Sequence, residues 1–316
     1  MKFRQLRTFV LIAEAGGLAR AADRLHLSQP AASRQIQALE AEFGVPLFDR
    51  IGRRIQLTSE GEDLLRRCRR LLQDADSIAE RARALKGGQT GILRVGATPQ
   101  VIEGTLAPFL TGHRKRYPGV EVHLVEAGGV SLATRLDRGD VHLALIALDP
   151  RHARFENRPL YWVWGLAILP ERHRLARQRT LELAQLADER LMLLDRTFIS
   201  REWFDNGCAI AHIHPHVLLE SGTPQTIVAL AATGYGIAIV PSTVRFSREG
   251  VRAVPIVQRG EPFGRWLTVA WDPERSLAPY ASKFIDELVI HCRGNYPGRE
   301  FAKRTPIPRP VLAAGG

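Results

Sequence analysis

The spacing of apolar and polar residues predicts three short helices at the start of the chain. Four apolar residues recur at i, i+3, i+4 and i+7, as on one face of an amphipathic helix: Leu6, Phe9, Val10 and Ala13. A second helix is expected over about 18–25, and a tight link at 26–28 separates it from a third over 29–43. Ser28 would cap the third helix and Gly44 would end it. The pattern therefore predicts a small tri-helical core containing a helix, a tight turn and a second helix.

The residues after this core predict a hairpin and one long helix. Strand-like pieces at 47–50 and 55–58, joined by Ile51-Gly52-Arg53-Arg54, indicate a hairpin with a basic tip, which resembles a wing. Thr58 or Ser59 can cap the helix that follows. Apolar residues then recur at alternating steps of four and three, forming a heptad seam: Leu64, Cys68, Leu71, Ala75, Ile78, Ala82 and Leu85. Because so narrow an apolar stripe between charged flanks would be poorly buried in a monomer, we expect the helix to pair with that of a second copy. The alternative is an amphipathic surface helix that lies on its own domain.

A different pattern begins after the short linker at 86–91, where strands and helices alternate. Strand-like runs are followed in most cases by helical stretches, which predicts parallel sheets: 92–97, 120–127, 141–147, 161–169, 190–195, 216–220, 236–240 and 266–271. Glycines and prolines near 164–165 and 262–264 indicate crossings between two lobes with a cleft. The expected fold class is thus α plus α/β, a winged helix-turn-helix, a long linker helix and a two-lobed α/β domain.

These patterns set the expected domain boundaries. They are a winged helix domain over 1–58, a dimerising helix and hinge over 59–90, and an α/β domain over 91–292. Within the α/β domain, one lobe takes about 91–163 and 266–292 and the other about 164–265. Residues 293–316 carry four prolines and several basic residues without core-forming periodicity, so a disordered basic tail is expected.

Composition excludes several classes of protein for this chain. The 316 residues are 45% hydrophobic and 24% charged, which excludes a wholly disordered or collagen-like chain. A formal charge of +11 favours a polyanionic partner. Three widely separated cysteines provide neither a disulfide framework nor a four-cysteine zinc site. We therefore expect the protein to reside in a reducing cytoplasm. No apolar stretch reaches the roughly 20 residues of a membrane helix, and the apolar run near the N-terminus is too short for an export signal.

The third predicted helix carries side chains suited to reading DNA. Opposite its apolar face it exposes four polar residues: Gln29, Ser33, Arg34 and Gln37. Arginine pairs with guanine and glutamine with adenine in the major groove, whereas Arg53 and Arg54 at the hairpin tip suit backbone phosphates. Residues 1–58 hold nine lysines and arginines against five aspartates and glutamates. The alternative is a tri-helical packing module with a solvated basic face.

The α/β region offers a candidate pocket in its cleft. Ligands of open α/β lobes lie beyond the carboxyl ends of strands, where free amides at helix N-termini favour anions. Two polar junctions of this kind are Thr98-Pro99-Gln100 and Ser221-Gly222-Thr223-Pro224-Gln225, and similar turns occur at 128–131 and 195–198. Such a lining suits a small carboxylate-bearing metabolite. Each junction can equally be an ordinary helix cap.

Three other patterns are weak. His212, His214 and His216 alternate as on one strand face, but no carboxylate or cysteine stands at a familiar metal-ligand spacing, so surface histidines are favoured. Cys208 lies four residues before His212 without an orienting group or an oxyanion loop. Gly234-Tyr235-Gly236 lacks the third glycine of a dinucleotide fingerprint and suits a tight turn. We expect no metal, no cofactor and no catalytic residues.

The motifs of the first 50 residues closely resemble those of the LysR-type transcriptional regulators. They are Leu6-Arg7-Thr8-Phe9, the run Ala21-Ala22-Asp23-Arg24-Leu25-His26-Leu27-Ser28-Gln29-Pro30-Ala31-Ala32-Ser33-Arg34-Gln35-Ile36, and Gly44-Val45-Pro46-Leu47-Phe48-Asp49-Arg50. The resemblance extends over about residues 1–292. It implies a winged helix-turn-helix, a dimerising linker helix and an effector domain like periplasmic binding proteins, commonly assembled as tetramers.

The resemblance also implies functional roles for individual residues. Gln29, Pro30, Ser33 and Arg34 match the DNA-facing positions of the family, and Arg53 and Arg54 match its wing. The effector contacts of the family come from the four turns named above, which implicates the following residues: Thr98, Pro99, Gln100, Gly129, Val130, Thr197, Phe198, Ser221, Thr223 and Gln225.

The expected function is ligand-controlled, sequence-specific binding of double-stranded promoter DNA. Activation rather than pure repression, and contact with RNA polymerase, are implied by the resemblance alone. One alternative is a solute-binding protein with an incidental N-terminal module, which the missing export signal disfavours. Another is an enzyme of small-molecule metabolism, for which no convincing catalytic set is present.

Overall fold

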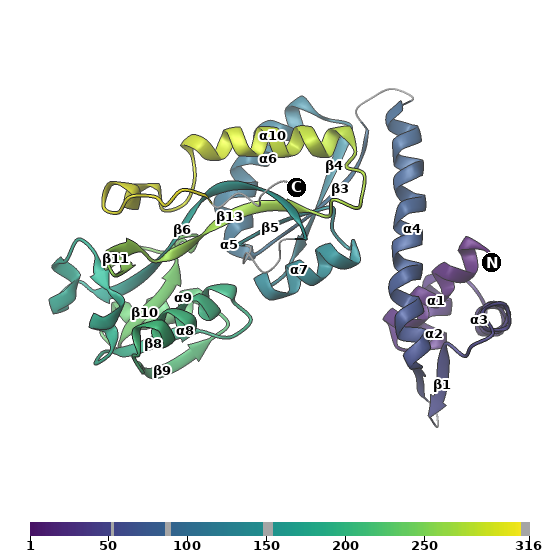
Figure 1. Cartoon of the computed structure of the whole chain (residues 1–316), viewed down its shortest axis with the longest axis horizontal. Helices are drawn as coiled ribbons and strands as arrows, with labels where there is room; N and C mark the ends of the chain where they lie inside the picture. The colour runs from purple at the N-terminus through teal and green to yellow at the C-terminus, as the bar shows by residue number, and fades with distance from the viewer. Residues whose placement is uncertain (52–53, 86–89, 148–153, 311–316) are drawn as a thin grey trace. The chain divides into compact units, whose positions relative to one another are not determined.

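The chain forms two compact units, Met1–Lys86 and Gly87–Gly316, in a computed structural model that describes residues 1–51, 54–85, 90–147 and 154–310 (Figure 1). The linker glycines at 87 and 88 lie outside the described residues. The side chains at 50, 51, 54, 81, 83–85 and 130 are also not described.

The first unit is a winged helix domain with a long final helix. Its helices are α1 (Phe3–Ala15), α2 (Leu18–Arg24), α3 (Gln29–Phe43) and α4 (Ser59–Leu85), and its strands β1 (Phe48–Ile51) and β2 (Arg54–Leu57) form an antiparallel pair. Gly16 and Gly44 take left-handed conformations, with φ of 61° and 73°, where α1 and α3 end. The predicted helices and hairpin therefore occur within a few residues of their expected bounds.

One hydrophobic core joins the helices of this unit. It gathers Leu6, Phe9 and Ile12 of α1 with Ile36 and Leu39 of α3. The first half of α4 also contributes to it, through Leu65, Cys68 and Leu72. The beginning of α4 is thus part of the winged helix domain rather than a separate linker.

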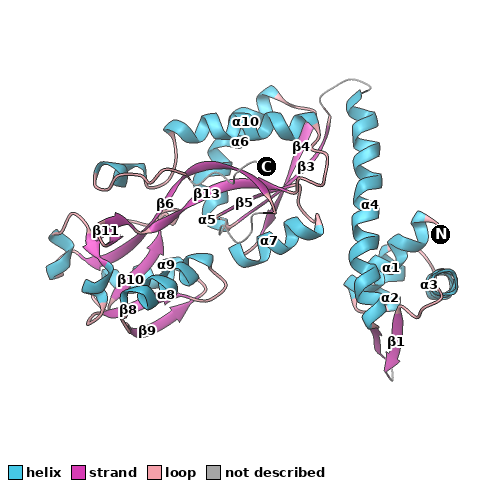
Figure 2. Cartoon of the chain, in the orientation of Figure 1, coloured by secondary structure: helices cyan, strands magenta, loops and turns pink. Residues whose placement is uncertain are grey.

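The second unit has two α/β lobes. Lobe I carries β3 (Gly91–Ala97), β4 (Val120–Glu126) and β5 (Leu143–Ile146), with α5 (Pro99–Val101), the π-helical turn η1 (Ile102–Leu106), α6 (Ala107–Arg116), α7 (Gly129–Arg138) and α10 (Pro279–Gly294). Core contacts place α6 and α10 on one face of its sheet and α7 on the other (Figure 2). The carboxyl ends of the parallel strands β3 and β5 lie side by side in this sheet.

Lobe II has a similar layered order. It carries β7 (Leu181–Glu182), β8 (Arg190–Leu194), β9 (His216–Ser221), β10 (Ile237–Pro241), β11 (Val251–Gln258) and β12 (Glu261–Pro262). Its helices are α8 (Ile199–Ala211) and α9 (Pro224–Ala232), with the 3₁₀ turns η3 (Arg174–Arg177) and η4 (Leu183–Leu186). Residues of α8 and α9 belong to different core clusters, which places the two helices on opposite faces of the sheet. Gly234, with φ of 83°, forms the turn from α9 to β10.

Two long strands join the lobes. β6 (Glu156–Pro170) pairs antiparallel with β13 (Gly264–Trp271) through Trp164, and from Gly165 onwards it pairs with β10 and β11. The predicted crossings near 164–165 and 262–264 coincide with this change of partner. The expected parallel pairing is confirmed for β3 with β4 and β5, and for β8 with β9 and β10. β6 and β13 run antiparallel to their neighbours, which was not predicted and which makes the sheet of each lobe mixed.

The expected disordered tail is wrong for residues 293–305. The chain continues from α10 into the 3₁₀ helix η5 (Arg299–Lys303), with Phe301 and Thr305 buried. Sequence periodicity could not reveal this, since single aromatic and hydroxyl side chains anchor the segment to distant residues. Residues 311–316 lie outside the described part of the chain.

Candidate functional site

The helix-turn-helix of the first unit holds α3 at the protein surface. His26 adopts a left-handed conformation, with φ of 52°, in the turn between α2 and α3. The Ser28 hydroxyl then accepts a hydrogen bond from the Ala31 amide at 3.3 Å, and Pro30 lies in the first turn, where a missing amide hydrogen costs nothing. These local features explain why α3 starts where the sequence predicts.

The outer face of α3 brings together the predicted DNA-binding side chains. Gln29, Pro30, Arg34 and Gln37 are exposed and Ser33 is half-buried, whereas Ala32, Ile36 and Leu39 are buried on the opposite face. Within the described residues, the Arg34 guanidinium makes no hydrogen bond or ion pair. Its five donors are therefore free to meet a partner outside the chain.

Two sets of part-buried hydrogen bonds, which the sequence did not reveal, fix the direction of α3. The Thr8 hydroxyl on α1 is fully buried and bonds the Gln35 Oε1 atom at 2.8 Å. Glu40 Oε1 accepts from the amides of Leu47 and Phe48 at 2.8 and 3.3 Å, which ties the end of α3 to the wing. Both links join segments that are distant in sequence.

The wing lies beside this face, but its tip is only partly described. β1 and β2 pair from Phe48 opposite Leu57 to Ile51 opposite Arg54. Arg53 lies outside the described residues, and of Arg54 only the backbone on β2 is described. The assignment of both arginines to phosphate contacts remains a prediction.

The predicted seam of α4 divides into two parts. Cys68 is buried in the core of its own unit, Leu64 packs against that core and Ala75 is half-buried. Further along, Leu71 is 39% exposed, Ile78 is 69% exposed and Ala82 is exposed. Of Leu85 only the helical backbone is described. The seam that is open to a partner therefore runs over the second half of α4.

A pocket in the second unit lies where the lobes meet. It has about 490 Å³ of empty space, its open mouth included. The first turns of three helices reach it, at Thr98 and Gln100 before and within α5, Gly129 of α7, and Phe198–Ser200 at the start of α8. Apolar side chains from both lobes form most of the remaining wall: Val101, Leu145, Ile146, Ala147, Val163, Trp203, Pro241 and Leu267. Thr243 adds a hydroxyl, and among the described residues no charged side chain lines the pocket.

The structure brings together part of the predicted effector set. Thr98, Gln100, Gly129 and Phe198 line this pocket. The remaining predicted residues are not among its lining residues: Pro99, Val130, Thr197, Ser221, Thr223 and Gln225. Sequence analysis missed the apolar wall, because buried strand residues of this kind look the same whether they face a core or a cavity.

Several predicted effector residues that do not line the pocket form hydrogen bonds within turns. Asp195 accepts from both the amide and the hydroxyl of Thr197, and the Ser221 hydroxyl accepts from the Thr223 amide at 3.1 Å. Of Val130 the side chain is not described. Thr197 nevertheless marks a close approach of the lobes, since a Cβ added at Gly128 would come within 3.0 Å of its carbonyl oxygen.

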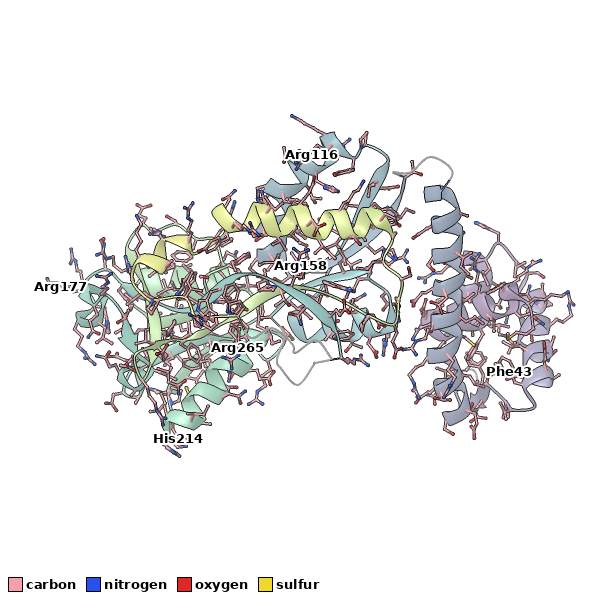
Figure 3. The ribbon with its side chains drawn as sticks, turned by 45° about the horizontal axis from the view of Figure 1, so that its top comes forward. Phe43, Arg116, Arg158, Arg177, His214 and Arg265 are labelled. Carbon is pink, nitrogen blue, oxygen red and sulfur yellow. The ribbon has the colours of Figure 1, made fainter. Side chains whose placement is uncertain are left out.

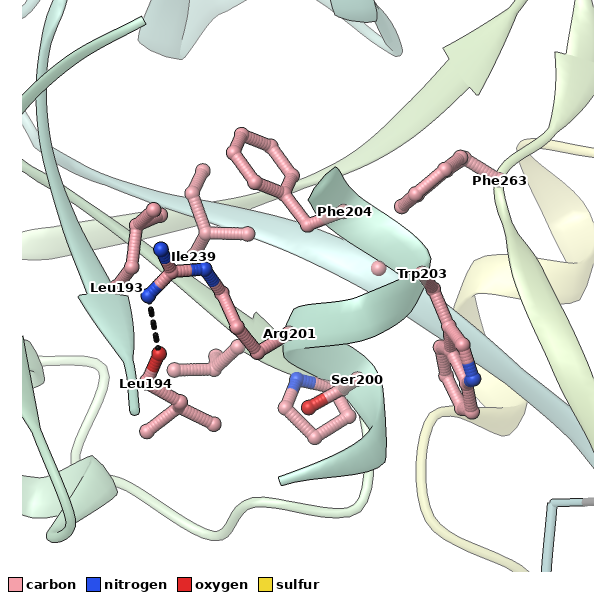
Figure 4. A pocket seen from close by; sticks show the side chains of 11 residues that line it. Leu193, Leu194, Ser200, Arg201, Trp203, Phe204, Ile239 and Phe263 are labelled. Carbon is pink, nitrogen blue, oxygen red and sulfur yellow. Dashed lines mark hydrogen bonds between the residues drawn. The ribbon is translucent and has the colours of Figure 1, made fainter. Parts of the chain in front are cut away.

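The first turn of α8 carries a buried arginine, Arg201 (Figure 4). Arg201 donates to the Leu194 carbonyl at 3.0 Å and to the carboxylates of Asp205 and Glu220 at 2.8 Å each. The hydrogen bond from Arg201 holds the pKa of Glu220 below its ordinary value. Because these partners satisfy its charge, Arg201 anchors α8 to the ends of β8 and β9. It lines a smaller neighbouring cavity and not the pocket described above.

The other candidate chemistries are not assembled in the structure. Among the described residues no group of three or more histidine, cysteine, aspartate or glutamate side chains is placed to hold a metal. His212, His214 and His216 are exposed, and Figure 3 shows His214 at the surface of lobe II. Burial, with a smaller contribution from Asp205, raises the pKa of the Cys208 thiol to about 12. No helix in the described part of the chain is long and apolar enough to span a bilayer.

Comparison with known proteins accounts for both units. Residues 3–62 match the family model of the bacterial regulatory helix-turn-helix protein, lysR family, and residues 86–293 match that of the LysR substrate binding domain. The chain belongs to the LysR family of transcriptional regulators. Its fold class is that of this family, and the chain is a DNA-binding regulator with an effector-binding domain rather than an enzyme.

Individual LysR-family proteins align with nearly the whole chain. The regulator IlvR of Caulobacter vibrioides is 33% identical, over 81% of this chain and 88% of IlvR. The uncharacterized regulator YnfL of Escherichia coli is 32% identical, over 93% of this chain and 99% of YnfL. The crystal structure of full-length CbnR complexed with its target DNA matches with a TM-score of 0.64 and 28% identity, over 93% of this chain and 99% of CbnR.

Proposed function

We propose that this LysR-family regulator reads specific promoter DNA with the exposed face of α3. The observation that carries the proposal is the unpaired guanidinium of Arg34, flanked on the same face by Gln29 and Gln37. In the major groove, Arg34 suits the O6 and N7 atoms of guanine, and the glutamines suit adenine. Ser33 and the amides of the first turn suit phosphate oxygens, as do Arg53 and Arg54 of the wing.

Substitution of the two kinds of arginine tests these roles. Arg34→Ala should lower affinity for the cognate duplex by ~1–3 kcal/mol while changing affinity for scrambled DNA little. Arg53→Ala should weaken binding to both duplexes alike and reduce the slope of log affinity against log salt by about 1. Arg177→Ala, which removes one exposed charge from the second unit, controls for net charge. Equal losses on cognate and scrambled DNA for both variants would remove the assigned roles.

We propose further that the second half of α4 pairs with the same helix of a second copy. Two copies then present two α3 helices to two half-sites, and a pair of such dimers would form a tetramer. The exposed stripe of Leu71, Ile78 and Ala82 supports the pairing. Promoter binding would take place in the bacterial cytoplasm.

The ligand proposed for the pocket is a compact metabolite with an apolar body and one carboxylate. The N-termini of α7 and α8 favour an anion, and no acidic side chain among the described residues lines the pocket to repel it. The wall of Val163, Trp203 and Leu267 favours an apolar body. Closure of the lobes around this ligand would shift the arrangement of the paired DNA-binding domains, provided that the ligand binds one lobe arrangement better than the other.

A thermal-shift screen of organic acids tests the pocket. A true ligand raises the melting temperature because it binds the folded form. The added stability grows with the logarithm of the ligand concentration and is about 2.7 kcal/mol at a concentration 100 times its Kd. Trp203→Ala should abolish the shift, whereas Trp271→Ala, on β13 outside the pocket lining, should retain it. A shift that survives Trp203→Ala would place the ligand elsewhere.

Activation of transcription, through contact with RNA polymerase, completes the proposal. It is supported by the resemblance to the family alone. Transcription from the bound promoter in a purified system, with and without ligand, tests it, since an activator raises transcript yield above that of the polymerase alone. A lower yield on binding would identify a repressor.

A further inference from the structure

The segment that follows α10 packs along both lobes of the second unit. Residues 295–305, here called the strap, lie beyond the region matched by the family model, which ends at residue 293. The strap includes η5, and it starts at lobe I and ends in lobe II (Figure 1). Its contacts are with residues far away in sequence.

The first strap residues contact lobe I. The Tyr296 ring stacks on Tyr161 of β6, with ring centroids 5.1 Å apart and planes 17° apart. Tyr161 is itself fixed in lobe I, where its hydroxyl bonds the Thr105 hydroxyl at 2.6 Å. Pro297 lies against Gly104, since a Cβ added there would come within 2.7 Å of the proline Cγ.

The last strap residues are anchored in lobe II. Phe301 is 2% exposed and joins the core cluster that includes Leu166 and Val244. The Trp164 indole donates to the Thr305 hydroxyl at 2.7 Å, and this hydrogen bond is buried. Exposed polar contacts add to the anchoring, because Arg248 pairs with Glu300 and Arg304 donates to the Ala253 carbonyl at 3.3 Å.

Between these anchors the strap contacts the hinge from behind the pocket. Pro241 and Thr243 line the effector pocket, and Ser242 between them faces the strap. A Cβ at Gly298 would lie 2.7 Å from Ser242, and Gly298 has a φ of 84° that favours glycine. The Ser242 hydroxyl accepts from the Trp164 amide at 3.2 Å, at the residue where β6 changes partner from β13 to β10. One short segment therefore separates the strap from the pocket.

We propose that the strap fastens lobe I to lobe II at the hinge and positions the 241–243 segment of the pocket. With both ends anchored in different lobes, the strap restricts rotation about Trp164 and Gly165. The consequence for ligand binding rests on the proposed function, but the mechanical role does not. Phe301 is the main anchor, because it buries the largest apolar side chain of the strap.

Hydrogen exchange measured by mass spectrometry on the full chain, without any ligand, tests the strap directly. Phe301→Ala should accelerate exchange of the hinge amides at 164, 165, 242 and 244 by at least about tenfold. Exchange in β4, the edge strand that β3, β5 and β13 separate from β6, should stay unchanged. Phe301→Leu should restore most of the protection, and Ile307→Ala, at a partly exposed position after the strap, is the matched control.

Two results would overturn the proposal. One is uniform acceleration across the second unit, which indicates a loss of global stability and no local fastening. The other is unchanged hinge exchange in both Phe301→Ala and a chain ending at Gly294. Neither result depends on the effector, so a failed ligand screen and a failed strap are distinguishable.

Discussion

At the residue scale, α3 carries its polar side chains on the face turned away from the core of its unit. Helical periodicity alone separates the buried side chains of Ile36 and Leu39 from the exposed ones of Arg34 and Gln37, so one face follows from the other. The contacts that hold this face could not be predicted, since Glu40 meets amides of the wing only after the chain has turned back. The same holds for Arg201, whose partner Glu220 is nineteen residues away.

His142 in lobe I makes the stability of the second unit depend on pH. Burial, and then the nearby charges of Arg94 and Arg275, lower the pKa of this histidine to about 4. Arg94 faces both ring nitrogens, with its guanidinium 2.9 Å from Nε2. The folded unit therefore keeps His142 neutral at pH values where the unfolded chain protonates it.

The expected pH dependence follows from that difference in bound protons. The contribution of His142 to the free energy of unfolding is fully present above about pH 6.5. As the pH falls towards 4, the free energy of unfolding decreases by on the order of 2–3 kcal/mol. Urea unfolding followed by tryptophan fluorescence measures it, because all five tryptophans lie in the second unit. His142→Gln should flatten the dependence between pH 6.5 and 4. An equally steep loss in that variant would assign the effect to other groups.

At the element scale, α4 shows both the reach and the limit of a heptad pattern. The long helix and its apolar repeat were predicted, and Leu71 and Ile78 are exposed as a partner surface requires. Cys68 belongs to the same repeat but packs under α1, because the start of α4 returns to the winged helix core. Periodicity gives the apolar side of a helix, and only the tertiary fold decides which neighbour covers each turn.

Substitution on the exposed stripe tests the pairing of α4. Ile78→Lys should lower the association constant of the dimer by at least about tenfold, since burial of an isoleucine side chain contributes ~1.5–3 kcal/mol and the pair loses two. Sedimentation equilibrium measures the constant. Ser77→Lys, which adds the same charge at the adjacent exposed position, should leave it nearly unchanged. Identical weakening by both substitutions would point to charge repulsion and not to a buried seam.

The strap is the element that sequence analysis misjudged. It belongs to the region 293–316, whose four prolines and several basic residues are typical of disordered segments, and no apolar periodicity contradicts that interpretation. Its order comes from isolated side chains, such as Phe301 and Thr305, that complete the lobe II core beside Trp164. Pairwise contacts of this kind leave no local pattern in the sequence.

At the scale of the whole molecule, the two-lobed organisation and the parallel pairing within each lobe were predicted, whereas the antiparallel strands that join the lobes were not. Alternating strands and helices indicate a layered α/β domain, and the glycines near 164 and 264 coincide with the crossings. The antiparallel runs of β6 and β13 arise because one strand serves both lobes, a topological fact that local patterns do not encode. The pocket forms only where these lobes meet, so its apolar wall was missed.

We propose above that paired copies of this LysR-family chain read a specific DNA sequence through α3. Selection from a pool of random duplexes at about 0.15 M salt, followed by footprinting of the enriched sequence, tests this role. We expect an enriched site with two related half-sites, separated by about one helical turn or a multiple of it. Selection with Arg34→Ala should relax the preference at one position of each half-site. Failure of the unaltered chain to enrich any sequence over the starting pool would rule out sequence-specific reading by α3.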